Sequence, residues 1–462
     1  METKNTENIQ ENKMGTMPIP KLLLTMALPM VLSMLVQALY NVVDSLFVAK
    51  ASEDGFKALS LAFPVQMLMI AMGAGTGVGI NALLSRSLGE KNFKEADKAA
   101  NNGLFLAFCS YLLFAVFGIV GSRFFFATQT NNQAIIDNGT WYIAICTIFS
   151  FGAMFQMTLE KLLQATGNSF YSMITQAVGA VLNMMLDPIL IFGMFGLPKL
   201  GVAGAAIATV IGQMTAMCLA LYFNVKKNKE IKLQIKGFRP DKKTIKNIYA
   251  VGIPAIVMQA IGSVMVFGMN KIFLSFSAED IAMAEGAVFV FGAYYKVQSF
   301  IFMPVFGLNN GMIPILAYNY GARHKKRIMD TIKLSVITAV CIMMIGLLVF
   351  QTSSGALLRI FDAAENVIQI GSPAFRIISL SFIFAGFCII ILSVFQAFGS
   401  GFLSLMVSAI RQLVVLLPVA FILSKVFGLS AVWFAFPIAE IASVTLSVIC
   451  LKYLYNKKIK NL

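Results

Sequence analysis

Long apolar stretches recur along the whole chain and constrain its fold more than any other feature. A helix needs about 20 apolar residues to cross the hydrocarbon core of a bilayer. Of the 462 residues, 58% are hydrophobic and 12% are charged, whereas soluble domains carry about 25% charged residues. The sequence therefore predicts an all-α polytopic membrane protein with twelve transmembrane helices, near residues 20–47, 58–85, 99–121, 135–159, 169–195, 200–224, 246–276, 284–318, 331–351, 367–396, 402–424 and 429–451.

The distribution of lysine and arginine predicts the orientation in the membrane. Basic residues are concentrated in the N-terminal segment, in every second loop and at the C-terminus, and the intervening loops hold few of them. Because cytoplasmic loops carry an excess of Lys and Arg, both termini are predicted to be cytoplasmic. The net charge of +15 is thus a consequence of topology, and since no groove-binding motif accompanies it, no nucleic-acid partner is expected.

Several signatures of other protein classes are missing from the sequence. A cleaved signal peptide has a positively charged region, then a short apolar region, then a cleavage site of small residues, and the polar N-terminal segment does not show this order. The six cysteines fall inside predicted spans without CxxC spacing, and no GxxxxGK[ST] motif occurs. No His, Cys or acid cluster suits hydrolysis or acyl transfer. We therefore expect neither an enzyme nor a bound cofactor.

The chain reads as two halves with the same orientation. Gly75, Gly79 and Gly89 correspond to glycines 307, 311 and 321, with an offset of 232 residues. With six spans each, the halves are related by a pseudo-twofold axis along the membrane normal and enclose a central cleft. The predicted boundaries are a tail at 1–19, an N-lobe at 20–224, a cytoplasmic linker at 225–245, a C-lobe at 246–454 and a tail at 455–462.

Proline recurs at equivalent places in the two halves. Pro29 follows Ala27-Leu28 in the first span, and Pro254 follows Gly252-Ile253 in the seventh. Proline removes a hydrogen bond within the helix and favours a kink. Pro29 and Pro254 are therefore predicted to be hinges.

Asp187 lies in the middle of residues 177–195, an apolar run with no other ionisable side chain. A charged residue at this depth costs about 2.5 to 3.5 kcal/mol on insertion scales, so it is expected to face a wet cavity, a cation or a proton path. Asn183 lies four residues earlier, on the same helical face. Pro188 leaves the carbonyl of Met184 without its usual donor, which adds an oxygen to the same turn.

Asp44 and Thr209 are predicted to lie at a depth in the membrane similar to that of Asp187. Asp44 lies near the outer end of the first span, and Thr209 lies about 13 Å into the sixth, at a rise of ~1.5 Å per residue. Oxygen ligands suit hard cations, and two close carboxylates in a low dielectric compete to hold a proton. We predict that Asp44, Asn183, Asp187 and Thr209 form a proton-coupling site or, with Asp44, Asn183 and Asp187 as metal ligands, a sodium site. The alternative for Asp44 is an interfacial acid at a span end.

Other intramembrane charges have different expected roles. Arg411 and Glu440 lie at comparable depth in adjacent spans and are predicted to neutralise one another. Lys296 and Arg376 are placed where they could face the cleft. Forty phenylalanines and 27 methionines offer polarisable surface that would permit binding of varied apolar cations. The predicted cavity residues are Gln37, Tyr40, Asn41, Tyr294, Lys296, Gln298 and Arg376.

Six segments of the N-terminal half together form a recognisable pattern: Ala27-Leu-Pro29, Tyr40-Asn-Val-Val-Asp44, Ser85-Arg-Ser-Leu-Gly89, Gln164-Ala-Thr-Gly167, Leu182-Asn-Met-Met-Leu-Asp-Pro-Ile-Leu-Ile-Phe-Gly193 and Gly201-Val-Ala-Gly-Ala-Ala-Ile-Ala-Thr209. On these residues the chain resembles the multidrug and toxic compound extrusion (MATE) family of cation-coupled antiporters, and the resemblance covers nearly its whole length. The resemblance implies two six-helix lobes around a cavity and a coupling site at Asp44, Asn183, Asp187 and Thr209. Some branches place an acid in span seven, which this sequence lacks.

The leading hypothesis is a multidrug efflux antiporter that exports amphipathic or cationic organic compounds in exchange for protons or sodium ions by alternating access. We expect a monomer in a bacterial-type plasma (inner) membrane, with drugs or organic cations and the lipid bilayer as partners. The alternative is a lipid or lipid-linked oligosaccharide flippase of a related fold, in which cationic side chains would line the cleft to meet phosphates.

Overall fold

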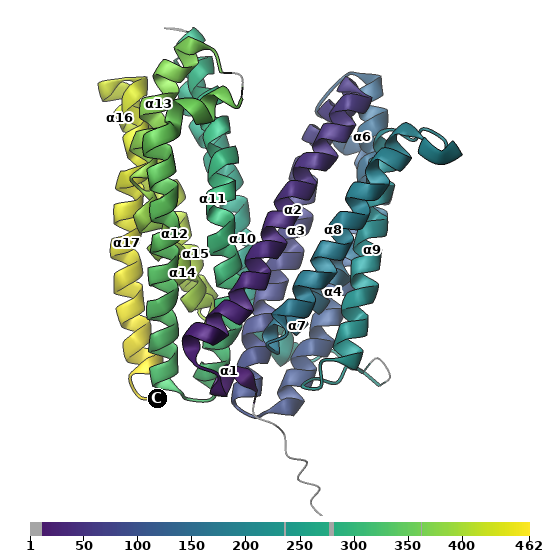
Figure 1. Cartoon of the computed structure of the whole chain (residues 1–462), viewed down its shortest axis with the longest axis vertical. Helices are drawn as coiled ribbons and strands as arrows, with labels where there is room; N and C mark the ends of the chain where they lie inside the picture. Colours follow the sequence, from purple (N-terminus) through teal and green to yellow (C-terminus); the bar gives the residue numbers. More distant parts are fainter. Residues whose placement is uncertain (1–11, 235–236, 277–280, 362) are drawn as a thin grey trace, which may run out of the picture.

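The computed structural model describes residues 12–234, 237–276, 281–361 and 363–462. These residues form a bundle of long helices (Figure 1). The elements are α1 (Lys13–Thr16), α2 (Ile19–Ala51), α3 (Glu53–Gly89), α4 (Phe93–Val120), α5 (Ser122–Ala127), α6 (Gln133–Ile148), α7 (Phe151–Ala165), α8 (Ser169–Phe192), η1 (Met194–Gly196), α9 (Val202–Lys226), α10 (Lys242–Leu274), α11 (Ile281–Gly321), α12 (Lys325–Arg359), α13 (Glu365–Ser379), α14 (Phe382–Ala397), α15 (Gly401–Ala409), η2 (Ile410–Leu416), α16 (Leu417–Phe427), η3 (Leu429–Phe434), α17 (Ala435–Leu454) and η4 (Tyr455–Ile459).

The helices account for the predicted spans. Within the described ranges, 10 helical segments are long and apolar enough to cross a membrane, and two bent pairs bring the number to 12. The pair α6 and α7 bends by 46°, and the pair α13 and α14 bends by 48°. These are the fourth and tenth spans, which occupy the same place in the two halves. The predicted all-α membrane fold with twelve spans is confirmed.

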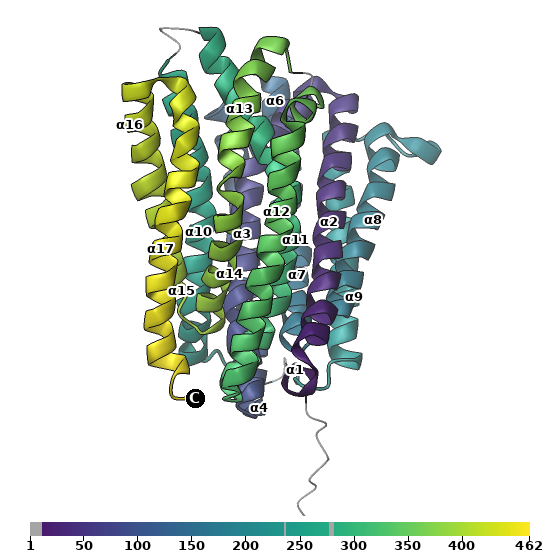
Figure 2. The same cartoon turned by 60° about the vertical axis from the view of Figure 1, so that its left-hand side comes forward.

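The two halves form separate bundles that meet at one end. Helices α2 to α9 make one bundle, the N-lobe, and helices α10 to α17 make the other, the C-lobe; the ribbons diverge toward the top of Figure 1. Both described chain ends lie at the bottom, as the rotated view in Figure 2 also shows. The Arg327 side chain at the start of α12 donates there to the carbonyls of Met14 and Met17, at 2.9 and 2.8 Å. We call this the basic end and the opposite one the distal end.

Paired glycines bring the backbones of the lobes into contact near the basic end. A Cβ added at Gly307 would lie 2.6 Å from Cα of Val31, and one at Gly311 would lie 2.7 Å from Cα of Ala27. In the other half, a Cβ at Gly75 would lie 2.9 Å from the backbone nitrogen of Ile256. A side chain therefore has no room at these crossings of α11 with α2 and of α3 with α10.

The same arrangement continues to the helix ends and reproduces the sequence repeat. A Cβ at Gly89 of α3 would overlap the carbonyl of Tyr318 in α11, and a Cβ at Gly321 of α11 would overlap the carbonyl of Arg86 in α3. Each glycine thus contacts the residue three positions before its partner glycine. Small residues let membrane helices approach closely, so the repeated glycines build a pseudo-twofold contact between the lobes.

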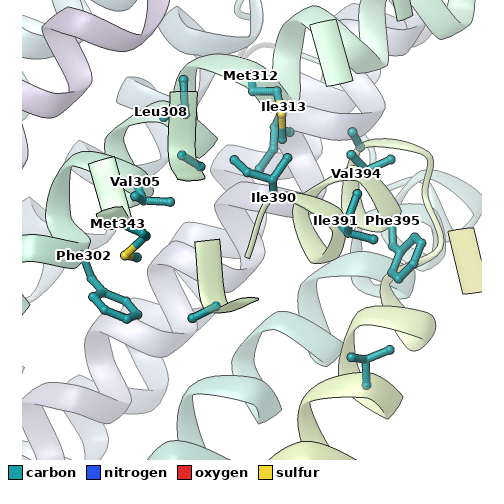
Figure 3. Close-up of a cluster of buried hydrophobic side chains, with 14 of the residues drawn as sticks. Phe302, Val305, Leu308, Met312, Ile313, Met343, Ile390, Ile391, Val394 and Phe395 are labelled. Atoms are coloured by element: carbon teal, nitrogen blue, oxygen red, sulfur yellow. The ribbon is translucent and has the colours of Figure 1, made fainter. Parts of the chain in front are cut away.

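The interior of the C-lobe is packed with apolar side chains. Figure 3 shows one part of this packing, where Phe302, Val305 and Leu308 of α11 lie among side chains of α12 and α14 such as Met343 and Ile390. In a bilayer the hydrophobic effect contributes little between helices, so dispersion contacts of this kind hold the bundle together.

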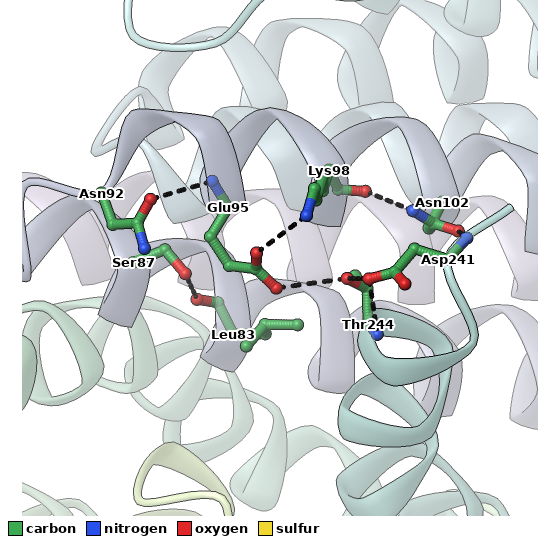
Figure 4. A network of polar contacts seen from close by, with 8 residues as sticks. All are labelled: Leu83, Ser87, Asn92, Glu95, Lys98, Asn102, Asp241 and Thr244. Atoms are coloured by element: carbon green, nitrogen blue, oxygen red, sulfur yellow. Dashed lines mark hydrogen bonds and ion pairs between the residues drawn. The ribbon is translucent and has the colours of Figure 1, made fainter. Parts of the chain in front are cut away.

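The segment between the lobes is fastened to α4. Asp241 accepts a hydrogen bond from the amide of Thr244 at 3.2 Å and so caps α10, while its own amide donates to Asn102 of α4 at 2.9 Å (Figure 4). Glu95 of α4 accepts a bond from the Thr244 hydroxyl at 3.2 Å and lies 3.6 Å from the Lys98 ammonium. The start of the C-lobe is therefore held to the N-lobe by a polar network.

Candidate functional site

The four predicted coupling residues come together from three helices of the N-lobe. Asp44 lies on α2, Asn183 and Asp187 lie on α8, and Thr209 lies on α9. Their exposed fractions are 6, 3, 0 and 8%, respectively. The Asn183 amide donates to the Thr209 hydroxyl at 3.1 Å. We call these four residues the coupling site.

Close helix packing sets the geometry of the coupling site. A Cβ at Gly212 of α9 would lie 2.7 Å from the carbonyl of Gly179 in α8, and one at Gly204 would lie 2.5 Å from the carbonyl of Leu190. The two backbones therefore touch on both sides of Thr209, which brings its short side chain within reach of Asn183. Helix α2 also packs along α8, and Asp44 and Asp187 interact electrostatically.

Four oxygens of the coupling site receive no hydrogen bond from the described residues. Both carboxyl oxygens of Asp187, Oδ1 of Asp44 and Oδ1 of Asn183 are buried and have no hydrogen-bond partner among the described residues. Buried polar atoms in proteins are almost always paired. Four such oxygens on neighbouring helices provide acceptors for a proton or for a hard cation, which prefers oxygen ligands. No group of three His, Cys, Asp or Glu side chains able to hold a metal is found in the part of the chain described.

Tyr40 extends the coupling site by one helical turn. Its hydroxyl lies close enough to Thr209 and Asp44 to interact with both. Residue 40 was predicted as a cavity residue, and the structure joins it to the coupling residues. The ring is half-buried, and its neighbours Gln37 and Asn41 on α2 are exposed.

The C-lobe residues predicted to line the cavity lie in different environments. Lys296 and Arg376 are exposed and Gln298 is half-buried. The ammonium of Lys296 lies 5.6 Å from the ring centre of Phe361, a cation–π distance. Tyr294, in contrast, is 3% exposed. It is surrounded by the rings of Phe350, Phe375, Phe382 and Phe436, so the structure places it in the C-lobe core and not on an open wall.

The predicted neutralisation of Arg411 by Glu440 is found in the structure. Nη1 of Arg411 in η2 lies 2.6 Å from Oε1 of Glu440 in α17. The element η2 is π-helical and ends two residues before Pro418. Proline disrupts the hydrogen bonds of a regular helix, and a π-turn is one way to accommodate the break.

Two charged residues of α7, Glu160 and Lys161, lie beyond the predicted end of the fourth span. The fourth span was predicted to end at residue 159, but α7 continues to Ala165 and therefore includes Glu160 and Lys161. Glu160 is 4% exposed and Lys161 is half-buried. The signal that marks them is the spacing of Gln156, Glu160 and Gln164, which repeats every four residues and places polar groups on one face of an otherwise apolar helix.

Comparison with known proteins gives one consistent result. The family model MatE matches residues 29–189 and 254–422, one segment in each lobe. The multidrug export protein MepA of Staphylococcus haemolyticus (strain JCSC1435) is 24% identical over 438 residues, covering 95% of this chain and 94% of that protein. MepA of Staphylococcus aureus (strain MSSA476) is 25% identical over 433 residues, covering 92% of this chain and 91% of its own length.

Solved structures share the fold. A multidrug resistance MATE family transporter in an outward-facing conformation superposes with a TM-score of 0.89 at 22% identity, covering 98% of this chain and 99% of that one. A MATE structure in the straight conformation also has a TM-score of 0.89 at 22% identity, with the same coverage.

Proposed function

The chain belongs to the MatE family, and we propose that it is a secondary active transporter that exports amphipathic or cationic organic compounds in exchange for protons or sodium ions. Its relatives are named multidrug export proteins, which supports a transporter and not an enzyme. The family model matches both lobes, so the proposal concerns the whole two-lobe unit.

The orphaned oxygens of the coupling site carry this proposal. Ionised carboxylates in a low dielectric are costly without a partner. Binding of a proton or a sodium ion between Asp44 and Asp187 would remove that cost, and release of the ion would restore it. The coupling site can therefore exist in two states of different charge.

Helix α2 connects the charge of the coupling site to the contact between the lobes. It carries Asp44 toward its distal end and touches α11 through Ala27 and Val31 nearer the basic end. Pro29, one of the predicted hinges, lies between these two contact residues. A shift of α2 on ion binding would therefore act on the lobe contact, which is the element that must open and close in alternating access. The hinge role of Pro29 and Pro254 remains a proposal.

Orientation follows from charge. The basic end holds the lysine-rich segments, so the positive-inside rule places it, with both termini, in the cytoplasm of a cell bounded by a bacterial-type plasma membrane. The lobes then touch on the cytoplasmic side and diverge outward (Figure 1). The flippase alternative loses one of its cationic groups, since Glu440 neutralises Arg411. A monomer is sufficient for this mechanism.

Efflux from proteoliposomes tests the proposal. A fluorescent organic cation such as ethidium is loaded, and a proton or a sodium gradient is imposed separately. We expect one of the gradients to drive transport and Asp187→Asn to reduce that transport at least about tenfold, equivalent to ~1.4 kcal/mol. Asp137→Asn, at an exposed acid near the start of α6, is the matched control. Gradient-driven transport that is unchanged in Asp187→Asn would contradict the assignment.

A further inference from the structure

Glu160 is a buried carboxyl outside the coupling site. Its Oε1 accepts hydrogen bonds from Gln156 at 2.9 Å and Thr175 at 3.0 Å, and its Oε2 accepts one from Gln176 at 2.7 Å. All three donors are neutral, and no salt bridge to Glu160 is found in the ranges that the structure describes. The donors favour the ionised form, while burial in an apolar medium favours the protonated form. The surroundings thus suit a group that exchanges a proton.

A polar seam joins Glu160 to the coupling site. Gln176 of α8, which donates to Glu160, also accepts a hydrogen bond from Ser33 of α2. The two helices run parallel, and hydrogen bonds join Met26 to Ser169 and Ser33 to Gln176, each pair 143 residues apart in sequence. The same separation relates Tyr40 to Asn183 and Asp44 to Asp187, and the last two residues interact electrostatically. Steps of seven and four residues return to one helical face. The α2–α8 seam therefore extends from Glu160 to Asp187 over about 16 Å at ~1.5 Å per residue.

Lys161 links the neighbourhood of Glu160 to the other lobe. Its ammonium donates to Gln164 of α7 and to Asn310 of α11, both at 2.9 Å. Consecutive residues on a helix point about 100° apart, so Glu160 faces α8 inside the N-lobe while Lys161 faces the C-lobe. The two side chains interact electrostatically. Separation of the lobes would take Asn310 away from Lys161 and change the field at Glu160.

In the described part of the chain, the other elements around Glu160 contribute no second counter-charge. Helix α8 presents Thr175 and Gln176 to Glu160. Ser33 of α2 bonds to Gln176, and a Cβ at Gly77 of α3 would lie 2.7 Å from Cγ of Lys161. Helices α4 and α9 also pack against α7. No hydrogen bond or ion pair from their described residues to Glu160 is found, so Lys161 is the charge positioned to influence it.

We propose that Glu160 is a second proton-binding site at the inner end of the α2–α8 seam, and that Lys161 couples its proton occupancy to the contact between the lobes. This inference rests on the proposed function, with the proton as the coupling ion. While the lobes touch, Asn310 and Gln164 hold the Lys161 ammonium. When they part, Lys161 loses one acceptor, and Glu160 exchanges its proton with cytoplasmic water as an organic cation enters.

Proton counting tests the site directly. Calorimetry of tetraphenylphosphonium binding to the purified full-length protein, repeated in buffers of different ionisation enthalpy, gives the protons released per bound cation. We expect Glu160→Gln to bind the probe with fewer protons released than the wild type, and Glu160→Asp to restore the release. Asp137→Asn is expected to match the wild type. An unchanged proton count in a folded Glu160→Gln protein would overturn the proposal.

A double-mutant cycle tests the role of Lys161 and does not depend on the Glu160→Gln variant alone. Asn310→Ala removes an acceptor of Lys161 and is expected to shift the pH midpoint of probe binding. In the Glu160→Gln background, the same substitution is expected to cause no shift; a shift that persists there would refute the coupling. If Glu160→Gln does not elute as a folded monomer, Asn310→Ala is tested in the Glu160→Asp background instead. There the shift of the pH midpoint is expected to differ from the shift in the wild-type background, and an equal shift would contradict the proposal. Absence of gradient-driven efflux in the wild type would instead reject the proposed function.

Discussion

The two lobes have a similar arrangement of helices but differ in their buried charges: an acid without a described partner in the N-lobe and an ion pair in the C-lobe. At the offset of 232 residues set by the paired glycines, Val419 occupies the place in the C-lobe that Asp187 has in the N-lobe. In the N-lobe, Asp187 has no partner for either carboxyl oxygen among the described residues. In the C-lobe, the nearby Arg411 is matched by Glu440 at 2.6 Å. The paired glycines at the lobe contact are retained in both halves, whereas, among the described residues, a buried carboxyl with both oxygens unpaired is found only at Asp187 in the N-lobe.

This difference separates structural charge from functional charge. A matched ion pair holds its two helices in one arrangement, whereas an unmatched acid leaves a place for an ion to enter and leave. The contrast is testable, because removing charge should destabilise the C-lobe and should mainly affect transport in the N-lobe.

Breaking the C-lobe pair is expected to have the largest effect on stability. Arg411→Leu leaves Glu440 without its cation in a mostly buried position, which should cost about 3 kcal/mol. The double variant Arg411→Leu, Glu440→Leu removes both charges and should recover most of that loss. Thermal unfolding in detergent measures both. A single variant as stable as the wild type would show that the pair has no structural role.

The lobe contact should respond symmetrically to added side chains. Gly79→Ala and Gly311→Ala each introduce a Cβ against the backbone of the other lobe, and overpacking of this kind costs about 1–3 kcal/mol. We expect similar losses of thermal stability in the two variants, together with slower transport. Gly292→Ala, at a position on α11 with open space around it, is the control. Strongly unequal effects of the two variants would contradict the pseudo-twofold contact.

Within the coupling site, the Thr209 hydroxyl is expected to contribute modestly. Thr209→Val keeps the shape of the side chain but removes the acceptor of the Asn183 amide, at a cost of about 1 kcal/mol. We expect a several-fold loss of gradient-driven efflux with only a small loss of thermal stability, and Thr209→Ser should restore both. Full activity of the valine variant would exclude Thr209 from coupling.

The smallest expected effect lies in the polar network at the start of α10. The Thr244 hydroxyl donates to Asp241 and holds the pKa of that carboxyl below its ordinary value. A carboxyl with a depressed folded pKa stabilises the folded state above its unfolded pKa of about 3.9, and the contribution is lost as pH falls through the lower folded pKa. Asp241→Asn still caps the helix but does not titrate. We expect the amide hydrogen-exchange rate of the segment between the lobes, corrected for the intrinsic pH dependence of exchange, to rise at acid pH in the wild type. In this variant the corrected rate should not depend on pH.

The sequence by itself determined the membrane fold, the twelve spans and the repeat, and it predicted the four residues that the structure brings together and for which a coupling role is proposed. These follow from local rules: apolar length predicts a span, and a four-residue spacing places Asn183 and Asp187 on one face whatever packs against it. The pairing of Arg411 with Glu440 was also predicted, because both lie at one depth in neighbouring spans.

Only the tertiary structure decided which polar groups are satisfied. It buried Tyr294 in an aromatic cluster, placed Tyr40 close to Thr209 and Asp44, and left the Asp187 oxygens without a partner among the described residues. It also showed that α7 runs past the predicted end of its span, so that Glu160 and Lys161 point into different lobes. Helical periodicity gives the direction of a side chain relative to its own helix. The neighbour that it meets depends on how distant helices pack, and no local pattern in the chain contains that information.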